Sequence, residues 1–237
     1  MLNSARPLRA AVLTSHRAPG MAELLAEQGD LFRLVCVVTS EEDFSQARLD
    51  EAGVPVVRNL IRRFYAWHRA PISDLAVRRA YDHRTGRLLA PFRPDLILMS
   101  SYLYIVTRPL LAAYPGRIVN VHGSDLARRG PDGLPLYPGL RAVRDSIRAG
   151  ETETRACSHL VTAELDAGPI LRRSRPFPVP AVAAALRQAG ADHAVNAYAY
   201  AHQEWMLATA WGPLLLDAIA QLASEARALP AAAGAAP

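Results

Sequence analysis

The sequence predicts an α/β protein built on a doubly wound, mostly parallel open sheet with a C-terminal helical extension. Short apolar runs of strand length alternate with helical segments along most of the 237 residues, which is the pattern of βαβ units. One run, residues 94–101, contains a continuous apolar stretch, as expected of a strand covered on both faces in a parallel sheet. The chain length fits one domain.

Apolar or β-branched runs that end at turn-forming residues predict the strands. They cover residues 8–15, 32–40, 54–59, 94–101, 117–124, 154–162 and 169–179. The last two are expected to pair antiparallel, because the prolines of 169–179 suit an edge. Helical periodicity and closing glycines predict the helices. These cover residues 21–29, 41–53, 107–116 and 138–151, with helical pieces between 62 and 87.

The C-terminal part is predicted to form two helices. Residues 192–211 have helical character, and Gly212 and Pro213 are expected to end that helix, because proline removes a backbone hydrogen bond. A second helix is expected from 214 to 229. The chain therefore divides into an α/β domain at 1–190, helices packed on the same domain at 191–229, and a flexible low-complexity tail at 230–237.

The net charge of +5 is carried without lysine, because all 27 basic residues are arginine. This excludes Schiff-base catalysis and a P-loop lysine. Arginine is dense between 58 and 93, where a solvated helix face is the favoured interpretation; a nucleic-acid patch and a cradle for an acidic substrate are the alternatives. Cys36 and Cys157 form neither a disulfide framework nor a zinc motif and are expected to be core residues.

Targeting and membrane signals are weak in this sequence. No apolar run approaches the ~20 residues of a membrane helix, and the N-terminal apolar stretch is too short for a signal peptide. We therefore expect a cytoplasmic protein with neither a membrane nor a nucleic acid as partner. A homodimer is compatible with the sequence, which does not fix the oligomeric state.

Asn120 and His122 interrupt an apolar strand close to its carboxyl end. Because side chains alternate along a strand, both point to the same face. Ligand sites of open α/β sheets lie beyond the carboxyl ends of the strands. A second polar group, Thr162, Glu164 and Asp166, stands in a later loop, where an aspartate alone is most often a turn former.

Together these residues resemble a known signature. From Arg93 to Leu171 the sequence is similar to the folate-dependent formyltransferase family, which includes glycinamide ribonucleotide transformylase and the catalytic domain of methionyl-tRNA formyltransferase. The family has Asn-x-His at a strand end and, downstream, a Leu-Asp-x-Gly-Pro loop. Asn120, His122 and Asp166 occupy these positions, and two further family positions are matched by Ser124 and His159.

The resemblance implies transfer of a formyl group from 10-formyltetrahydrofolate to an amine. Asn120 and His122 would stabilise the oxyanion of the tetrahedral adduct, while Asp166 would hold the imidazole and relay the amine proton through water. No metal is required. The folate is expected to lie against two segments, which comprise Leu103, Tyr104, Ile105, Val106, Thr162, Glu164 and Leu165.

Departures from the family concern the acceptor. The glycine-rich phosphate loop of the purine enzyme is reduced to Gly20 and Met21 behind Pro19, which has no amide proton. An insertion after His122 carries Arg128 and Arg129 and is expected to shape the acceptor pocket. Ser124, Gly20 and Met21 are the other predicted acceptor contacts. Two further departures are Tyr104, which replaces an arginine of the purine enzymes, and the lack of a C-terminal tRNA-binding β-domain.

We therefore expect an N-formyltransferase acting on a small-molecule amine, such as an amino acid, an amino sugar or a natural-product intermediate. One alternative is a formyltetrahydrofolate deformylase, in which water replaces the amine. Another is a glycinamide ribonucleotide transformylase with an altered phosphate loop. A non-catalytic binding protein would not need Asn120, His122 and Asp166 together.

Overall fold

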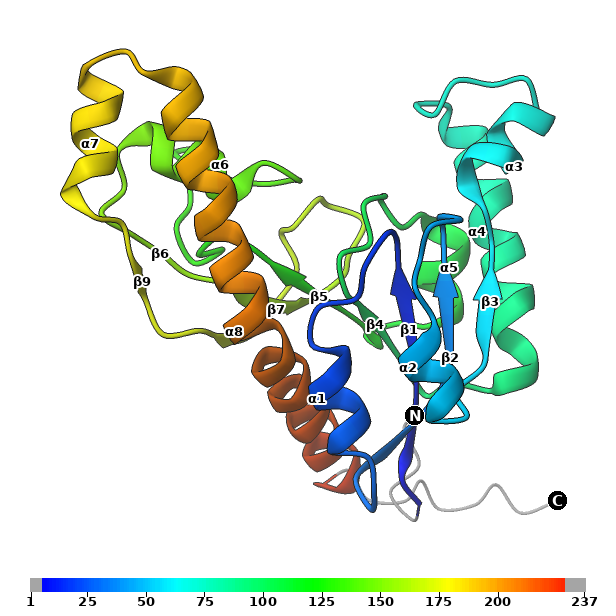
Figure 1. The fold of residues 1–237 in the computed structure, drawn as a ribbon. Coiled ribbons are helices and arrows are strands. Elements are labelled where there is room, and N and C mark those ends of the chain that lie inside the picture. Colours follow the sequence, from blue (N-terminus) through cyan, green and yellow to red (C-terminus); the bar gives the residue numbers. More distant parts are fainter. Residues whose placement is uncertain (1–5, 229–237) are drawn as a thin grey trace, which may run out of the picture.

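A seven-stranded sheet forms the centre of the computed structural model, which describes residues 6–228 (Figure 1). Its strand order is β3-β2-β1-β4-β5-β7-β8, and β1 to β5 are parallel. The strands are β1 Leu8–Thr14, β2 Phe32–Thr39, β3 Val56–Arg58, β4 Leu96–Met99, β5 Ile118–His122, β7 Cys157–Leu160 and β8 Ile170–Arg173. This topology confirms the doubly wound, mostly parallel sheet.

Antiparallel pairing completes the far end of the sheet. β7 pairs with β5 and β8 pairs with β7, both antiparallel. A separate ribbon is formed by β6 (Glu153–Thr154) and β9 (Phe177–Pro178). The helices are α1 Met21–Ala26, α2 Ala47–Glu51, α3 Ile61–Trp67, α4 Leu75–Leu89, α5 Arg108–Ala113, α6 Ala142–Ala149, α7 Ala181–Gln188 and α8 Asp192–Ala228, with a 3-10 turn at Ala90–Phe92.

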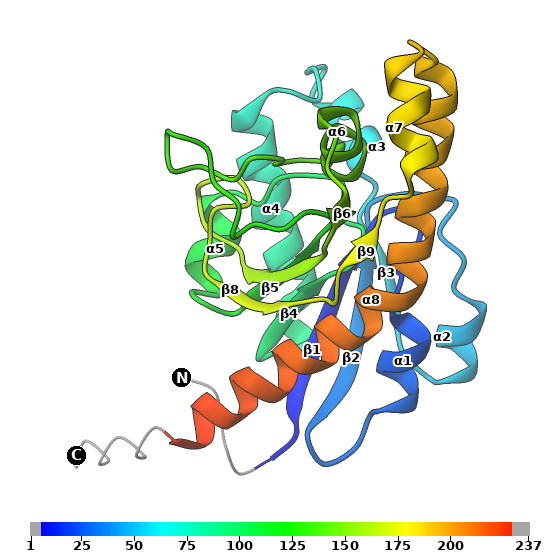
Figure 2. The same ribbon diagram turned by 90° about the vertical axis from the view of Figure 1, so that its left-hand side faces the viewer.

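Helices cover both faces of the sheet (Figure 2). Alternate residues of β1 point to different cores: Ala10 and Val12 pack with α1, α6 and α8, whereas Ala11 and Leu13 pack against α4 and α5. A strand buried on both faces needs apolar residues at every position. This explains why β1 and β4 lack the alternation of polar and apolar residues found in half-exposed strands.

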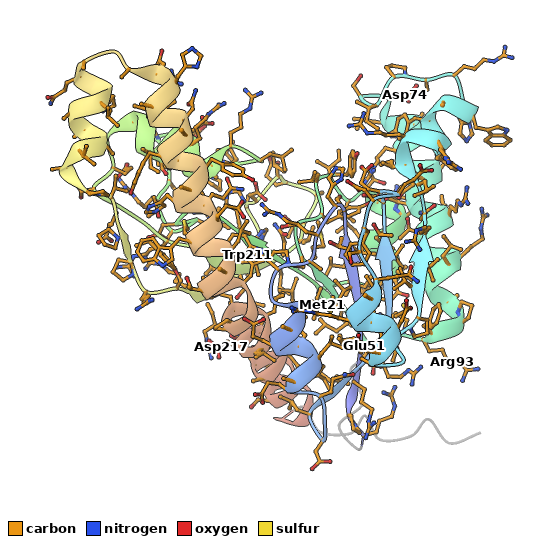
Figure 3. All side chains as sticks on the ribbon, viewed as in Figure 1. Met21, Glu51, Asp74, Arg93, Trp211 and Asp217 are labelled. Atoms are coloured by element: carbon orange, nitrogen blue, oxygen red, sulfur yellow. The ribbon has the colours of Figure 1, made fainter. Side chains whose placement is uncertain are left out.

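Helix α8 runs unbroken through Gly212 and Pro213, so the predicted break and the two separate C-terminal helices are wrong. Proline inside a helix costs about 3 kcal/mol, which burial of the following turns, including Leu215 and Ile219, offsets. Gly212 serves close packing, since a Cβ there would lie 2.6 Å from Cδ of Glu23 in α1. Trp211 and Met21 mark this helix contact in Figure 3.

Other boundaries differ where tertiary contacts override local propensity. The helix predicted at 41–53 is reduced to α2, because Glu41 is buried and accepts a hydrogen bond from the Tyr104 hydroxyl. The single strand expected at 169–179 is divided into β8 and β9, and α7 is an additional helix. The tail predicted at 230–237 lies outside the described residues.

Burial settles three questions left by composition. Cys36 and Cys157 are both buried and free, as predicted. Most arginines of the 58–93 segment are exposed, but Arg78 is buried. Residues 192–225 of α8 are long and apolar enough to cross a membrane, yet 61% of the most apolar window is buried inside the structure. Length and composition are therefore weak grounds for a membrane helix here.

Candidate active site

A cavity of about 480 Å³ opens at the carboxyl ends of β4 and β5. Its walls are the segment that follows β4, the loop between β7 and β8, the start of α6 and one face of α8. Asn120, His122 and Asp166 all line this cavity. The place agrees with the rule that open α/β sheets bind ligands beyond the carboxyl ends of their strands.

The cavity wall is largely apolar and partly open to solvent. Every residue predicted to contact the folate lines it, namely Leu103, Tyr104, Ile105, Val106, Thr162, Glu164 and Leu165. Ile105, Leu140 and Leu165 keep 46%, 66% and 50% of their surface exposed. Large apolar side chains left open around a concavity are typical of a ligand-binding surface.

His122 and Asp166 form a buried pair on the cavity wall. His122 Nδ1 lies 3.5 Å from Oδ2 of Asp166, and His122 Nε2 lies 2.9 Å from the carbonyl oxygen of Tyr137. Nε2 is therefore the donor to Tyr137. Nδ1 faces the Asp166 carboxylate at a distance longer than a normal hydrogen bond.

Asn120 is oriented by His159 on the neighbouring strand. The two residues are paired in register across β5 and β7, and Asn120 Nδ2 lies 3.2 Å from His159 Nε2. His159 Nδ1 lies 3.1 Å from the Leu160 carbonyl oxygen. The tautomer that fits both contacts donates from Nδ1 and accepts at Nε2, which leaves the second Asn120 N–H for a ligand.

Burial lowers the pKa of His159 below its ordinary value of 6.5. The charge of Asp166, whose Oδ1 lies 3.7 Å from His159 Nε2, opposes the shift, and His122 adds to it. A lowered pKa keeps His159 neutral at pH 7. This state agrees with its role as the acceptor for the Asn120 amide.

The loop between β7 and β8 brings Asp166 back to the strand end. Asp166 itself has φ 52°, in the left-handed region that aspartate tolerates better than most residues. Its Oδ2 accepts a hydrogen bond of 2.7 Å from the Gly139 N–H. A Cβ at Gly168 would lie 1.9 Å from the Leu160 carbonyl oxygen, so only glycine lets the loop pass this strand.

Gly20 and Met21, predicted to contact the acceptor, line a second pocket of about 580 Å³. Leu207 of α8 lines both pockets, so the two are neighbours. Two of the three basic side chains of the second pocket have acidic partners, whereas the third, Arg48, forms no ion pair among the described residues. Arg17 donates to Glu204 at 2.6 and 2.7 Å, and His16 contacts Asp43 at 2.7 Å.

Three other predicted acceptor contacts line neither of these pockets. Ser124 donates to the Tyr137 carbonyl oxygen at 2.8 Å, and Arg128 forms an ion pair with Glu151. Arg129 is exposed and donates to the carbonyl oxygen of Gly133 at 2.8 Å, within the insertion. Ser124, Arg128 and Arg129 therefore lie outside the cavity that contains the predicted catalytic residues, although Ser124 shares the Tyr137 carbonyl oxygen with His122.

Some lining residues are not identifiable from the sequence pattern. Gln203, Leu207 and Trp211 form one stripe of α8 on the cavity wall, but a spacing of four residues is equally typical of a core helix face. His159 has a better signal, since it is a polar residue inside an apolar strand. Within residues 6–228, no group of three or more His, Cys, Asp or Glu side chains could hold a metal ion.

Comparison with protein families and curated proteins gives one consistent result. The family model described as formyl transferase matches residues 8–201. Phosphoribosylglycinamide formyltransferase of Escherichia coli K12 is 30% identical over 110 residues, which cover 46% of this chain and 48% of that protein. The protein of the same name from Mycobacterium tuberculosis H37Rv is 31% identical over 175 residues, which cover 73% and 72%.

A hydrolase is also among the similar proteins. Formyltetrahydrofolate deformylase of Escherichia coli K12 is 24% identical over 172 residues, which cover 72% of this chain and 54% of that protein. The chain thus spans about half the length of both Escherichia coli relatives. Its fold matches the crystal structure of glycinamide ribonucleotide transformylase 1 from Symbiobacterium toebii, with a TM-score of 0.71, 24% identity, and 93% and 90% of the two chains covered.

Proposed function

The chain belongs to the formyl transferase family, and from this premise we propose that it transfers the formyl group of 10-formyltetrahydrofolate to the amine of a small molecule. One observation carries the proposal. Asn120, His122 and Asp166 converge on the cavity whose wall contains every residue expected to hold the folate. A protein that only bound folate would not need these three groups beside the apolar wall.

The proposed reaction joins the amine nitrogen to the formyl carbon, whose oxygen takes up negative charge in a tetrahedral adduct. The free N–H of Asn120 donates to that oxygen. His122 lies on the same cavity wall and contributes through its ring, whose Nδ1 faces Asp166. Loss of one such interaction typically costs about 2.7 to 4 kcal/mol of barrier.

Collapse of the adduct then breaks the bond between the formyl carbon and N10 of the folate. The proton lost by the amine has to reach this leaving nitrogen. Asp166 is the carboxylate on the cavity wall beside His122, so it is suited to relay that proton through water. Electrons and protons balance without a metal ion or a covalent enzyme intermediate.

The cavity fits the folate donor. Its volume of about 480 Å³ lies within the usual range for sites of this kind, roughly 300 to 1,000 Å³. Apolar walls at Leu103 and Ile105 suit the flat faces of a pterin. Tyr104, which replaces an arginine of the purine enzymes, is held by a 2.7 Å hydrogen bond from its hydroxyl to Glu41.

The second pocket is the proposed acceptor site. A phosphate would need free backbone N–H groups at the start of α1. Pro19 has none, and the Met21 N–H is bonded to the Ala18 carbonyl oxygen at 3.2 Å. Arg17 is paired with Glu204, which leaves Arg48 as the one basic side chain of the pocket without an ion pair among the described residues. These features favour an amine without a phosphate, such as an amino acid, an amino sugar or a natural-product intermediate.

The test is to incubate the protein with 10-formyltetrahydrofolate and a panel of amines that includes glycinamide ribonucleotide. Tetrahydrofolate release is followed with and without each amine, and formylated products are identified by mass spectrometry. We expect release to depend on one non-phosphorylated class of amine. His122→Ala should abolish most of it, and full activity of that variant would contradict the proposed mechanism.

Two other results would replace the proposal. Equal release without any amine would identify a deformylase, the activity named for a 24% identical relative. Preference for glycinamide ribonucleotide would show that the altered loop still accepts a phosphate. Either result would leave the family and the folate cavity in place but change the acceptor.

A further inference from the structure

We propose that the backbone of residues 137–139, anchored through Glu151, is the positioning element that aligns His122 with Asp166. The segment touches both members of the pair. The Tyr137 carbonyl oxygen accepts the hydrogen bond from His122 Nε2 at 2.9 Å, and the Gly139 N–H donates to Asp166 Oδ2 at 2.7 Å. The inference rests on the proposed function of the pair.

Pro138 restricts the backbone between the two contacts. Pro138 fixes its own φ near −65°, and Gly139 has φ 76°, a conformation that glycine adopts without strain. The Ser124 hydroxyl also donates to the Tyr137 carbonyl oxygen, at 2.8 Å. A displacement of Tyr137 would therefore move an acceptor that holds both His122 and Ser124.

A side-chain contact holds the segment in place. The Tyr137 hydroxyl donates to Glu151 Oε1 at 2.8 Å, and Arg128 forms an ion pair with the other oxygen of the same carboxylate. Glu151 follows the C-cap Gly150 of α6, and its backbone N–H donates to the Ser146 carbonyl oxygen in that helix. The anchor is thus attached to a helix whose inner face packs in the core.

The charges are consistent with a permanent anchor. Burial acts against the charged form of Glu151, but the hydrogen bonds from Arg128 and Tyr137 outweigh it and lower the pKa of this carboxyl. Burial and the bond to Glu151 raise the pKa of Tyr137 to about 12. At neutral pH Tyr137 is therefore the donor and Glu151 the charged acceptor.

The insertion after β5 has a defined part in this arrangement. It folds as a short hairpin in which Leu136 N–H donates to the Arg128 carbonyl oxygen at 3.0 Å, and Arg129 bridges to Pro135. The hairpin sets Arg128 next to Tyr137, and both side chains reach Glu151. Arg128 therefore acts on the catalytic pair through the anchor, whereas Arg129 has no such contact among the described residues.

The test compares Tyr137→Phe and Glu151→Gln with Glu225→Gln, at an exposed glutamate near the end of α8, as the matched control. Loss of the anchor should lower kcat by about 10- to 100-fold, the scale of a small misplacement of reacting groups, while KM for 10-formyltetrahydrofolate stays within about twofold. The control should keep the wild-type kcat. Both changes act on the same contact, the one between Tyr137 and Glu151. The double variant should therefore be no slower than the slower single variant.

A second readout does not depend on turnover. In protein labelled with ¹⁵N-histidine, the His122 Nε2 proton should exchange slowly, because it is buried and bonded to Tyr137. The His122→Ala variant assigns this signal, and Tyr137→Phe should make it exchange rapidly at an unchanged unfolding temperature. Glu151→Gln, which keeps the shape of the side chain, serves if Tyr137→Phe does not fold.

Wild-type kcat in both variants, together with an unchanged His122 signal, would overturn the inference. Multiplicative effects in the double variant would also overturn it, because independent sites give additive free energies. Failure of the proposed function is distinguishable. In that case wild-type protein releases no tetrahydrofolate with any amine or with water, while the His122 signal still reports whether the anchor holds the ring.

Discussion

Replacing Asp166 with asparagine removes a charge while it keeps the size of the side chain. His122 Nδ1 and Asp166 Oδ2 are 3.5 Å apart, and both side chains are less than one-tenth exposed. At this separation two unit charges interact by about 5 kcal/mol at an effective dielectric constant of about 20, and by about 1 kcal/mol in bulk water.

These limits correspond to a loss of between roughly 5-fold and roughly 4 × 10³-fold in kcat, at about 1.4 kcal/mol per decade. Because the pair is buried, we expect Asp166→Asn to lie in the upper half of that range, with KM for 10-formyltetrahydrofolate little changed. The assay is steady-state tetrahydrofolate release at saturating amine. Asp192→Asn, an exposed carboxylate on α8, is the control. A kcat within threefold of wild type would refute the electrostatic role of Asp166.

Three further predictions concern the folate wall, meaning the cavity wall at residues 103–106 and 162–165, the loop at Gly168, and the dependence of stability on pH. Asp82 accepts hydrogen bonds of 2.6 Å from both the N–H and the hydroxyl of Thr107, which directly follows residues 103–106 of the folate wall. Asp82→Asn should therefore raise KM for 10-formyltetrahydrofolate by about tenfold, and an unchanged KM would contradict this. Gly168→Ala should lower the free energy of unfolding, measured by urea titration, by more than about 2 kcal/mol. Gly86→Ala, in a helix with open space where the Cβ would lie, should raise it by about 0.5 to 1 kcal/mol in the same assay. Burial lowers the pKa of His202 below 6.5. As the pH falls below 6.5, the unfolded state therefore binds more protons than the folded state, and the protein becomes less stable. In His202→Gln the unfolding temperature should fall less between pH 7.5 and pH 5 than it does in the wild type.

The sheet and one half of the candidate site are predictable because their signals are local. β5 follows from its β-branched run, and alternation alone places Asn120 and His122 on one face. The convergence of Asp166 is a long-range contact, which only the family resemblance predicts. Its physical causes, the left-handed φ of Asp166 and the close passage of Gly168, depend on the packing of two loops.

The limit of prediction from the sequence is clearest for two adjacent residues with the same side chain. Arg128 and Arg129 have identical chemistry and equal prior claims to the acceptor, yet one reaches Glu151 and the other only the turn at Gly133. The hairpin that separates them is fixed by backbone pairing within the insertion. No periodicity in the sequence predicts this hairpin, because turns of this length are set by the contacts of their ends.

Arg78 illustrates the same limit in the arginine-rich segment. It was predicted as part of a solvated face, but it is buried, and its Nε and Nη2 donate to the Ile105 carbonyl oxygen at 2.9 and 2.6 Å. A buried guanidinium persists only where partners satisfy it. Its acceptor Ile105 is on the folate wall, 27 positions away in the chain, and its ionic neighbour Asp82 lies one helical turn along α4. The surrounding arginines therefore give no sign of its role.

The two pockets divide the site into parts that can change separately. The donor wall is built by segments that follow β4 and β7, and the neighbouring pocket by the loop after β1, α2 and α8. Leu207 lines both. Substitutions in α2 would therefore alter the proposed acceptor pocket without touching the folate wall or the His122–Asp166 pair, whereas α1 packs against α8 beside Trp211 of the cavity. This separation gives a physical reason why one fold can keep the donor chemistry while its acceptor changes.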